Sequence, residues 1–272
     1  MTSERRFPLP LGEGQGEGRE ANAAGVSPSP SAVGRGLSPA PPSAGRGDPA
    51  LQNKGSGPAI TGVIFDLDGV IIDSEGLQYH AYSIVLERFG VRVSREEYGR
   101  EWIAAGRGTQ YAVKTYNLPL SPDELKELKH PVYRELLHNE VTLMAGAEAA
   151  LARLSTCYPL ALATNSQRDE VSFVFDRFDL RRHFTAIITR EDYANAKPEP
   201  DAFLAAAKAL GLSPERCVVI EDAYKGVVAA YRAGCLCVAV PHDFTVDNDF
   251  SLATRVVKSL DEVSESLVAS LQ

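Results

Sequence analysis

The chain has 272 residues and a formal net charge of −8 at pH 7, with its glycine and proline crowded near the N-terminus. Residues 1–58 hold 11 of the 22 Gly and 9 of the 17 Pro, a density typical of disordered low-complexity segments. This tail has six Lys or Arg and five Asp or Glu, so the remaining chain carries −9, which argues against a nucleic-acid partner. No apolar stretch approaches the roughly 20 residues that span a bilayer, so we expect no membrane partner.

The cysteines indicate a reducing compartment. The chain has four, Cys157, Cys217, Cys235 and Cys237, without CxxC spacing, and three of them fall in apolar, strand-like runs. Buried reduced thiols are the expected state, and no apolar segment of a secretory signal follows the first arginines. We therefore expect a cytoplasmic protein, monomeric or weakly dimeric.

The first predicted strand is the apolar run Ile60–Phe65. Some 90 residues separate it from the next apolar run, far more than an ordinary crossover needs. These residues have helical patterns at about 75–89, 94–105, 109–117 and 122–138, followed by a shorter one near 147–155. We therefore predict a helical cap over 76–140, inserted into a core formed by 59–75 and 141–272.

The rest of the chain alternates apolar runs with amphipathic stretches. The later runs are Tyr158–Ala163, Ala186–Thr189, Cys217–Ile220 and Leu236–Val240, with a weaker one near Val256. Each has strand length and nearly continuous apolar character, as in parallel strands that are buried on both faces. Helices are predicted between them at about 166–179, 200–210 and 223–233. The alternation predicts an α/β protein with a Rossmann-like parallel-sheet core and helices on both sides.

Polar groups suited to phosphate chemistry follow four of the predicted strands. They are Asp66-Leu67-Asp68-Gly69-Val70, Thr164-Asn165-Ser166, Lys197-Pro198-Glu199-Pro200 and Glu221-Asp222. In open α/β sheets the ligand crevice lies at the carboxyl ends of the strands, so we expect all four groups to converge on one place.

Four carboxylates would meet there, from Asp66, Asp68, Glu221 and Asp222. They repel one another unless they are protonated or bound to a cation, and hard oxygen ligands in that number favour Mg²⁺. Lys197 would add a fixed positive charge, and the Thr164 hydroxyl with nearby backbone N–H groups would bind phosphate oxygens. Two aspartates two residues apart can divide the work, one as a carboxylate nucleophile and the other as a general acid and base.

These four groups, in this order, resemble the motifs of the haloacid dehalogenase superfamily. The helical insertion after the first strand resembles that of its subfamily I, which includes β-phosphoglucomutase and phosphoglycolate phosphatase. The resemblance covers residues 60–242. It implies that Asp66 is phosphorylated, that Asp68 shuttles the proton, and that Thr164, Asn165 and Lys197 bind phosphate. It also implies that Mg²⁺ binds Asp66, the main-chain carbonyl of Asp68 and Asp222, with support from Glu221.

The type of reaction is predicted from single residues at which members of this superfamily differ. Asp68 favours phosphoryl transfer over dehalogenation, because dehalogenases usually lack an aspartate there. Arg107, between Gly106 and Gly108, matches a cap arginine of the mutases and is a candidate substrate contact. Gln78 and Ile103, however, stand where the mutases have histidine and lysine. We therefore predict a phosphatase acting on a small organic monophosphate. A phosphomutase, or an idle protein that binds a phosphometabolite or a protein partner, is the alternative.

Three further residue assignments concern structure. Asp73 or Ser74 would cap the first cap helix, with Asp73 preferred. Gly226 would let its helix pack close to the sheet. The five histidines show no metal-ligand spacing and are interpreted as structural or surface groups: His80, His130, His138, His183 and His242.

Overall fold

A computed structural model of the chain describes residues 58–271, so the predicted tail, apart from Pro58, lies outside the described residues. The described part contains a six-stranded parallel sheet in the order β3-β2-β1-β4-β5-β6. The strands are β1 (Gly62–Phe65), β2 (Leu160–Ala163), β3 (Ala186–Ile188), β4 (Cys217–Glu221), β5 (Leu236–Ala239) and β6 (Arg255–Val256). The predicted α/β class and the six predicted strands are confirmed.

Strand β1 lies inside the sheet and pairs on both edges. Val63 is in register with Leu160 of β2 on one side and with Val218 of β4 on the other. All four residues of β1 are buried, as their apolar run predicted. The strand order reverses at β1, because β2 and β3 lie on one side of it and β4, β5 and β6 lie on the other. The carboxyl end of β1 is therefore the topological switch point, where open α/β sheets form their ligand crevice.

Alternate residues of the strands face two separate layers of helices. Ile64 belongs to the apolar cluster formed with α7 (Asp201–Ala209) and α8 (Tyr224–Ala233). Val63 and Phe65 face the other layer, formed by α5 (Ala147–Ser155), α6 (Arg168–Phe178) and α9 (Glu265–Ala269). Short 3-10 turns complete this part of the chain at Arg181–His183, Arg190–Asp192, Pro214–Arg216 and Leu260–Glu262.

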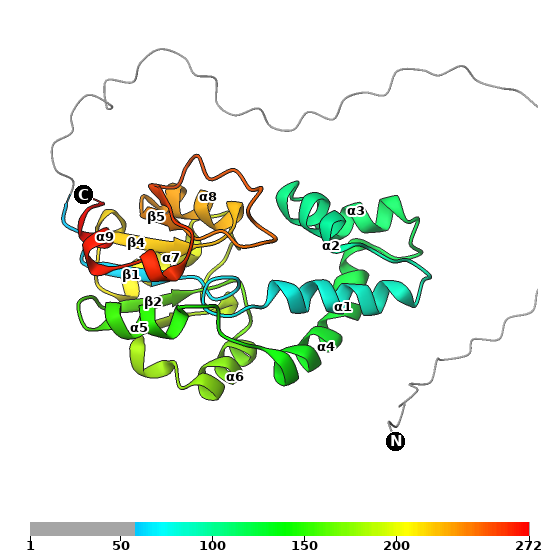
Figure 1. Cartoon of the computed structure of the whole chain (residues 1–272), viewed down its shortest axis with the longest axis horizontal. Helices are drawn as coiled ribbons and strands as arrows, with labels where there is room; N and C mark the ends of the chain where they lie inside the picture. Colours follow the sequence, from blue (N-terminus) through cyan, green and yellow to red (C-terminus); the bar gives the residue numbers. More distant parts are fainter. Residues whose placement is uncertain (1–57, 272) are drawn as a thin grey trace, which may run out of the picture. The chain divides into compact units, whose positions relative to one another are not determined.

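The helices inserted after β1 gather beyond the carboxyl ends of the strands (Figure 1). They are α1 (Glu75–Glu87), α2 (Arg95–Glu97), the π-helix η2 (Tyr98–Ala104), α3 (Gly108–Thr115) and α4 (Pro122–Glu140). Ser121 and Glu124 form a capping box at the start of α4, with Pro122 in its first turn. The predicted helical insertion is confirmed, although most of the segment expected as one helix over 94–105 is wound as a π-helix.

Two hydrogen-bonded chain segments join these helices to the core. Ile72 bridges to Leu143, and the Asp73 N–H donates to the Thr142 carbonyl at 3.0 Å. The N-cap position of α1 is occupied by Ser74, whose side chain makes no capping bond. The preference for Asp73 as the cap was therefore wrong, and the Ser74 hydroxyl has a different partner, described below.

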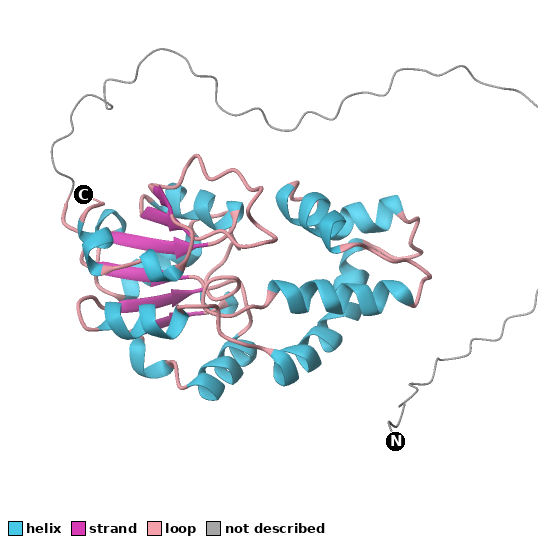
Figure 2. Ribbon diagram, in the orientation of Figure 1, coloured by secondary structure: helices cyan, strands magenta, loops and turns pink. Residues whose placement is uncertain are grey.

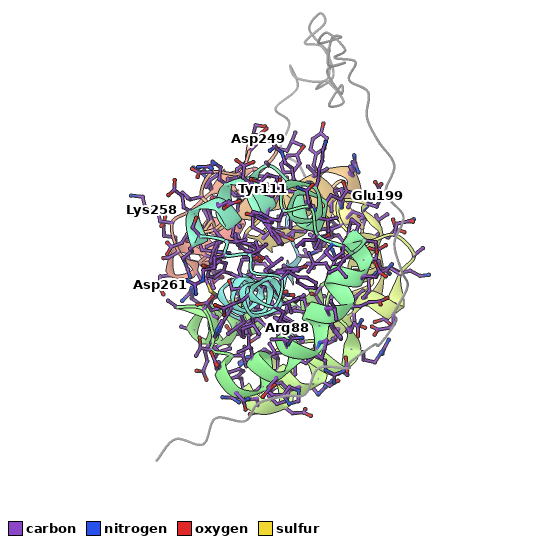
Figure 3. The ribbon with its side chains drawn as sticks, turned by 90° about the vertical axis from the view of Figure 1, so that its right-hand side faces the viewer. Arg88, Tyr111, Glu199, Asp249, Lys258 and Asp261 are labelled. Atoms are coloured by element: carbon purple, nitrogen blue, oxygen red, sulfur yellow. The ribbon has the colours of Figure 1, made fainter. Side chains whose placement is uncertain are left out.

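Charged side chains such as Glu199, Lys258 and Asp261 point outward from the ribbon (Figure 3). None of the helices in the described part of the chain is long and apolar enough to cross a membrane. The few charged side chains that are buried include Asp66, Lys197, Glu221 and Asp222, the residues predicted at the strand ends.

Candidate active site

Three carboxylates meet at the carboxyl edge of the sheet, where the strand arrows point toward the cap helices (Figure 2). Asp66 follows β1 directly, and its N–H donates to Ile220 of β4 at 3.0 Å. Glu221 is the last residue of β4, and Asp222 follows it. Because β1 and β4 are neighbours, one oxygen from each of Asp66, Glu221 and Asp222 lies within 4.8 Å of the others.

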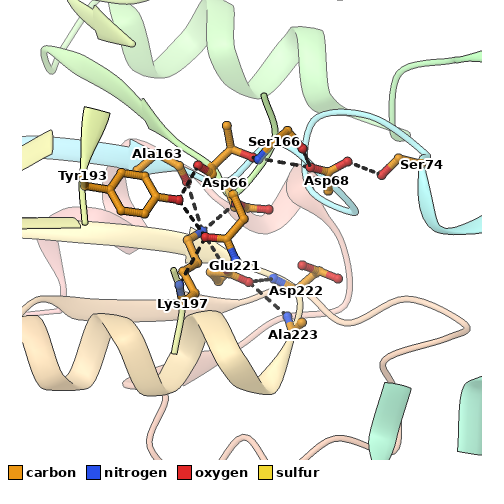
Figure 4. A network of polar contacts seen from close by, with 12 residues as sticks. Asp66, Asp68, Ser74, Ala163, Ser166, Tyr193, Lys197, Glu221, Asp222 and Ala223 are labelled. Carbon is orange, nitrogen blue, oxygen red and sulfur yellow. Dashed lines mark hydrogen bonds and ion pairs between the residues drawn. The ribbon is translucent and has the colours of Figure 1, made fainter. Parts of the chain in front are cut away.

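Lys197 supplies the positive charge at this cluster (Figure 4). Its buried ammonium donates to Asp66 Oδ1 at 2.6 Å, to Glu221 Oε1 at 2.9 Å and to the Ala163 carbonyl at 3.0 Å. Burial alone would lower the pKa of Lys197, but the Asp66 and Glu221 carboxylates outweigh this effect and raise it. Lys197 therefore stays charged and fixes the Asp66 carboxylate in one orientation.

The charges of the cluster fit a divalent cation. Three buried carboxylates face one ammonium group, and burial raises the pKa of both Asp66 and Asp222, with Glu221 adding to the effect in each. When the three carboxylates are ionised, the single ammonium group does not balance their negative charge, and their donor atoms are all hard oxygens. This is the donor set that Mg²⁺ prefers.

Asp68 is held apart from this cluster by hydroxyl groups. The Ser74 hydroxyl donates to Asp68 Oδ1 at 2.6 Å, and the Ser166 hydroxyl donates to Asp68 Oδ2 at 2.5 Å. The Thr164 hydroxyl makes a longer contact with Oδ2 at 3.4 Å. The side chains of Asp66 and Asp68 thus come from one loop but serve separate hydrogen-bond networks.

The residues after β2 are tied to the Lys197 loop by Tyr193. The Tyr193 hydroxyl contacts the Thr164 carbonyl at 2.8 Å and Asn165 Oδ1 at 2.7 Å, and Asn165 Oδ1 also accepts from the Lys197 N–H at 3.2 Å. Burial raises the pKa of Tyr193 to about 12, with Lys197 opposing the shift, so the hydroxyl keeps its proton. The sequence analysis missed Tyr193, which only its position four residues before Lys197 could have suggested.

His242 is a second contact that the sequence analysis missed. Its Nε2 lies 3.0 Å from Asp222 Oδ2, a contact with a predicted site residue that the interpretation as a structural or surface group did not include. Both atoms crowd Gly69, which has a φ of +74°: a Cβ there would lie 2.5 Å from Asp222 Oδ2 and 2.8 Å from His242 Nε2. The available signal was not ligand spacing but the position of His242 just beyond the end of β5.

A cavity of about 310 Å³ opens between these residues and the cap. Asp66, Asp68, Thr164, Asn165, Lys197, Glu221 and Asp222 line its core side, so the structure brings seven of the eight predicted site residues together. Residues 102–106 and Glu75 line its cap side. Arg107 is not among the lining residues: its guanidinium pairs with Glu101 at 2.6 Å and its side chain is 58% exposed.

A Rossmann-like core, a helical cap inserted after the first strand, and acidic groups at the ends of β1 and β4 define a class of capped α/β hydrolases. The chain belongs to the haloacid dehalogenase-like hydrolase family, whose profile matches residues 63–240. This match confirms the resemblance found in the sequence.

Similar proteins are named as enzymes that act on phosphate esters. "Putative phosphatase YhcW" of Bacillus subtilis is 32% identical over 212 residues, which is 77% of this chain and 96% of the relative. "Phosphorylated carbohydrates phosphatase" of Thermotoga maritima is 30% identical over 174 residues, 63% of this chain and 81% of the relative. The crystal structure of CbbY from Rhodobacter sphaeroides in complex with phosphate is 25% identical, with a TM-score of 0.63 over 77% of this chain and 99% of that one. The chain is thus a hydrolase of phosphate esters.

Proposed function

We propose that this protein is a Mg²⁺-dependent phosphatase that hydrolyses a small organic phosphate monoester through a phosphorylated Asp66. The observation that carries the proposal is the separate fixing of two aspartates in one loop. Asp66 is bound by Lys197 within the carboxylate cluster, whereas Asp68 is bound by serine hydroxyls outside it. Relatives named as phosphatases of phosphorylated metabolites support the substrate class.

In the proposed reaction, Asp66 is the nucleophile. Its carboxylate attacks phosphorus, the bond to the leaving oxygen breaks, and the phosphoryl group is transferred to Asp66. Mg²⁺ held by Asp66, Asp222 and the main-chain carbonyl of Asp68, with Glu221 in support, would neutralise the charge of the phosphate. Lys197 fixes the orientation of Asp66, which reduces the freedom lost on reaching the in-line geometry.

Asp68 moves the proton in both half-reactions. It protonates the leaving alcohol as the first bond breaks, and then takes a proton from the water that attacks the phosphorylated Asp66. Inorganic phosphate is released, and the Asp66 carboxylate is regenerated. The two serine hydroxyls that donate to Asp68 hold both of its oxygens, so its acidic proton is presented from a fixed position.

Phosphate oxygens would be bound from the sides of the sheet. Lys197 contributes its positive charge, because its three N–H groups already donate to Asp66, Glu221 and the Ala163 carbonyl. The amide nitrogen of Asn165 is the donor left after its oxygen has accepted from Tyr193 and Lys197. Thr164 is fully buried and its hydroxyl accepts from the Ser166 N–H at 3.0 Å, so its part is to shape the loop that donates to phosphate. The sequence predicted that the Thr164 hydroxyl binds phosphate directly, and the role proposed here for Thr164 differs from that prediction.

The cavity favours a phosphatase over a phosphomutase. Ile103, an apolar residue where the mutases carry lysine, lines the cap side. The amide oxygen of Gln78, which stands where the mutases have histidine, accepts from Lys129 at 2.5 Å. A volume of about 310 Å³ lies at the small end for ligand sites, which suits a small metabolite.

A cytoplasmic location is proposed as well, because all four cysteines are free thiols and three of them are buried.

The test is hydrolysis of p-nitrophenyl phosphate and of a panel of phosphometabolites, with and without Mg²⁺. Asp66→Asn should abolish turnover and form no phosphoenzyme, whereas Asp68→Asn should bind substrate and slow both half-reactions by about 10²–10⁴-fold. Beryllium fluoride with Mg²⁺ should bind the wild type and not Asp66→Asn. Full activity in excess EDTA, or a phosphoenzyme on another residue, would overturn the mechanism. If the wild type binds members of the panel but hydrolyses none of them, the alternative of a catalytically idle protein that binds a phosphometabolite holds.

A further inference from the structure

A short turn after β5 touches both the carboxylate cluster and the cap. The turn comprises residues 242–245 and is called here the β5 turn. Its two ends are closed by hydrogen bonds, because the Thr245 N–H donates to the His242 carbonyl at 2.8 Å and the His242 N–H donates to Thr245 Oγ1 at 3.1 Å. Thr245 is buried, so the turn is a compact unit rather than a loose loop.

One side of the β5 turn holds Asp222. His242 Nδ1 lies 3.4 Å from the Phe244 N–H, which donates to it, and this leaves the imidazole proton on Nε2. Nε2–H then donates to Asp222 Oδ2 at 3.0 Å. The imidazole thus occupies one carboxylate oxygen of Asp222 and leaves the other for a cation, which is the arrangement of an outer partner that orients a metal ligand.

The other side of the β5 turn is embedded in the cap. Phe244 is 5% exposed and belongs to the apolar cluster of the cap rather than to that of the sheet. Its ring meets Tyr98 edge-on at 5.7 Å between centroids and lies 6.3 Å from Tyr79. The Arg95 guanidinium lies over the Phe244 ring, 4.0 Å from its centroid.

His242 and Phe244 are two residues apart in this closed turn, so their positions are mechanically linked. We propose that the β5 turn couples the seating of the cap to the orientation of Asp222. His242 acts as the positioning residue, and Phe244 acts as the anchor in the cap. When Phe244 is seated between Tyr98 and Arg95, the imidazole is held against Asp222 and the cation site is complete. The inference rests on the proposed function, because it takes Asp222 as a ligand of Mg²⁺.

Coupling of this kind is reciprocal, so Mg²⁺ must favour the seated cap by the same factor by which the seated cap favours Mg²⁺. Trp102 is the one tryptophan of the chain, is buried in the same cap cluster, and lies 5.3 Å from Tyr98 between ring centroids. Its fluorescence therefore reports cap seating without any need for turnover.

The first experiment measures Mg²⁺ affinity of the full chain by titration calorimetry. His242→Ala should weaken Mg²⁺ binding about tenfold, as loss of an outer partner of a metal ligand typically does. His242→Gln, which can return an N–H donor to Asp222, should recover most of the loss. His183→Ala is the matched control, because that imidazole contacts Ser155 instead. Equal affinities for His242→Ala and wild type would overturn the role of His242.

The second experiment tests the link itself. Phe244→Ala should shift Trp102 emission to longer wavelength and weaken Mg²⁺ binding, although it removes no group near Asp222. Phe250→Ala is the matched control, since Phe250 packs on the sheet cluster and should change neither signal. If Phe244→Ala does not fold, Arg95→Ala removes the stacked cation from an exposed position and should shift both signals in the same direction. A shift in emission with wild-type Mg²⁺ affinity would overturn the coupling.

Reciprocity gives the third result. Mg²⁺ should shift Trp102 emission of the wild type to shorter wavelength and should have little effect on His242→Ala. Mg²⁺ that binds without changing the wild-type emission would overturn the coupling alone. A wild type that shows the linkage but hydrolyses no phosphate ester would overturn the proposed function and leave the coupling standing. No Mg²⁺ binding at all would overturn both.

Discussion

A Cβ added to Gly226 would lie 1.6 Å from Glu221 Oε1, far inside any contact that real atoms make. The Glu221 carboxylate lies against the first turn of α8, where its other oxygen accepts from the N–H groups of Asp222 at 2.9 Å and Ala223 at 3.1 Å. The sequence analysis assigned Gly226 to the close packing of its helix on the sheet, and the neighbour that a Cβ would meet is indeed a residue of β4. That residue is Glu221, so Gly226 also gives Glu221 the space it needs to reach Lys197.

Gly226→Ala should therefore displace Glu221 and remove its ion pair with Lys197. We expect overpacking to cost about 1–3 kcal/mol of unfolding free energy, together with a large loss of phosphatase activity. Urea unfolding and p-nitrophenyl phosphate turnover measure the two effects. Gly76→Ala is the matched control in α1, where a Cβ would come no closer than 3.8 Å to Asp73. Wild-type stability and activity in Gly226→Ala would contradict this account.

Lys197→Met should strongly destabilise the fold in the absence of metal. It leaves Asp66 and Glu221 buried without a counter-charge, and removing one partner of a buried ion pair typically costs about 3–5 kcal/mol. Because the pKa of Lys197 is raised in the folded state, its stabilising effect persists at every pH below its usual value and is lost only as the pH rises past the folded one. In Lys197→Met the Asp66 carboxylate, whose pKa burial already raises, loses the cation that lowers it and so takes up a proton more readily as the pH falls. The loss should therefore be larger at about pH 8 than at about pH 6, and a denaturation series that showed no such dependence would contradict this account.

Ser166→Ala should reduce kcat without unfolding the protein. It removes one of the two serine hydroxyls that donate to Asp68, a hydrogen bond to a charged group worth about 1.5–3 kcal/mol, so kcat should fall roughly 10–100-fold. The melting temperature should fall by only several degrees, so the protein remains folded under assay conditions. Ser155→Ala, whose hydroxyl bonds to the Ala152 carbonyl on an exposed helix end, is the control and should leave kcat unchanged. An unaltered kcat in Ser166→Ala would show that Asp68 needs no such support.

Glu170→Gln should stabilise the protein at neutral pH. Burial raises the pKa of Glu170, and within the described part of the chain Glu170 Oε1 has no hydrogen-bond partner. His130, 3.8 Å away, has its pKa lowered by burial and so supplies no positive charge at pH 7. The folded state binds the Glu170 proton more tightly than the unfolded state, so the wild type loses stability as the pH rises through the folded pKa.

Glutamine carries no such cost. The gain of Glu170→Gln over the wild type should therefore be present at pH 7 and disappear below about pH 3, where the carboxyl is protonated in both states of the wild type. Thermal unfolding at both pH values measures it, with exposed Glu135→Gln as the control. A gain that persisted at low pH would mean that packing, not ionisation, is responsible.

Trp102→Phe should raise KM for the physiological substrate. The indole N–H of Trp102 is buried beside the cavity and has no hydrogen-bond partner among residues 58–271, so a substrate acceptor would satisfy it. Phenylalanine keeps the aromatic packing but lacks the donor, so p-nitrophenyl phosphate, without a matching group, should be hydrolysed normally. Arg107→Ala tests the sequence-based candidate in the same assay. Equal losses on both substrates would assign either residue to cap packing.

The strands and the motif residues could be predicted because each is encoded by a short, continuous stretch of sequence. A parallel strand buried on both faces reads as a continuous apolar run, and the polar groups that follow it sit at a known edge of the sheet. Lys197 and Asp66 are 131 positions apart, yet the strand-end rule was enough to bring them together.

The residues that support the site were not predictable in this way. Ser74, Ser166 and Tyr193 are ordinary loop residues whose partners are decided by how three loops fold over one another. His242 contacts Asp222 because β5 is the neighbour of β4, and sheet order is not written in any single run of residues. The π-helical winding of η2 was also beyond reach, since a short amphipathic segment has nearly the same pattern in either helix.

The central place of β1 also determines how the molecule opens. Its amides are bonded on both edges, the Val63 N–H to the Pro159 carbonyl and the Asp66 N–H to the Ile220 carbonyl. Exchange at Val63 requires β1 to separate from the β2 side, and exchange at Asp66 requires it to separate from β4. Because β1 lies inside the sheet, we expect both amides to exchange with a free energy close to that of global unfolding. The N–H groups of Ala105 and Gly106 donate to the Arg100 and Ile103 carbonyls within the cap, so they exchange when the end of η2 opens locally. One exchange experiment therefore reports two free energies, the global stability that holds Asp66 in place and the lower cost of local opening in the cap segment that lines the cavity.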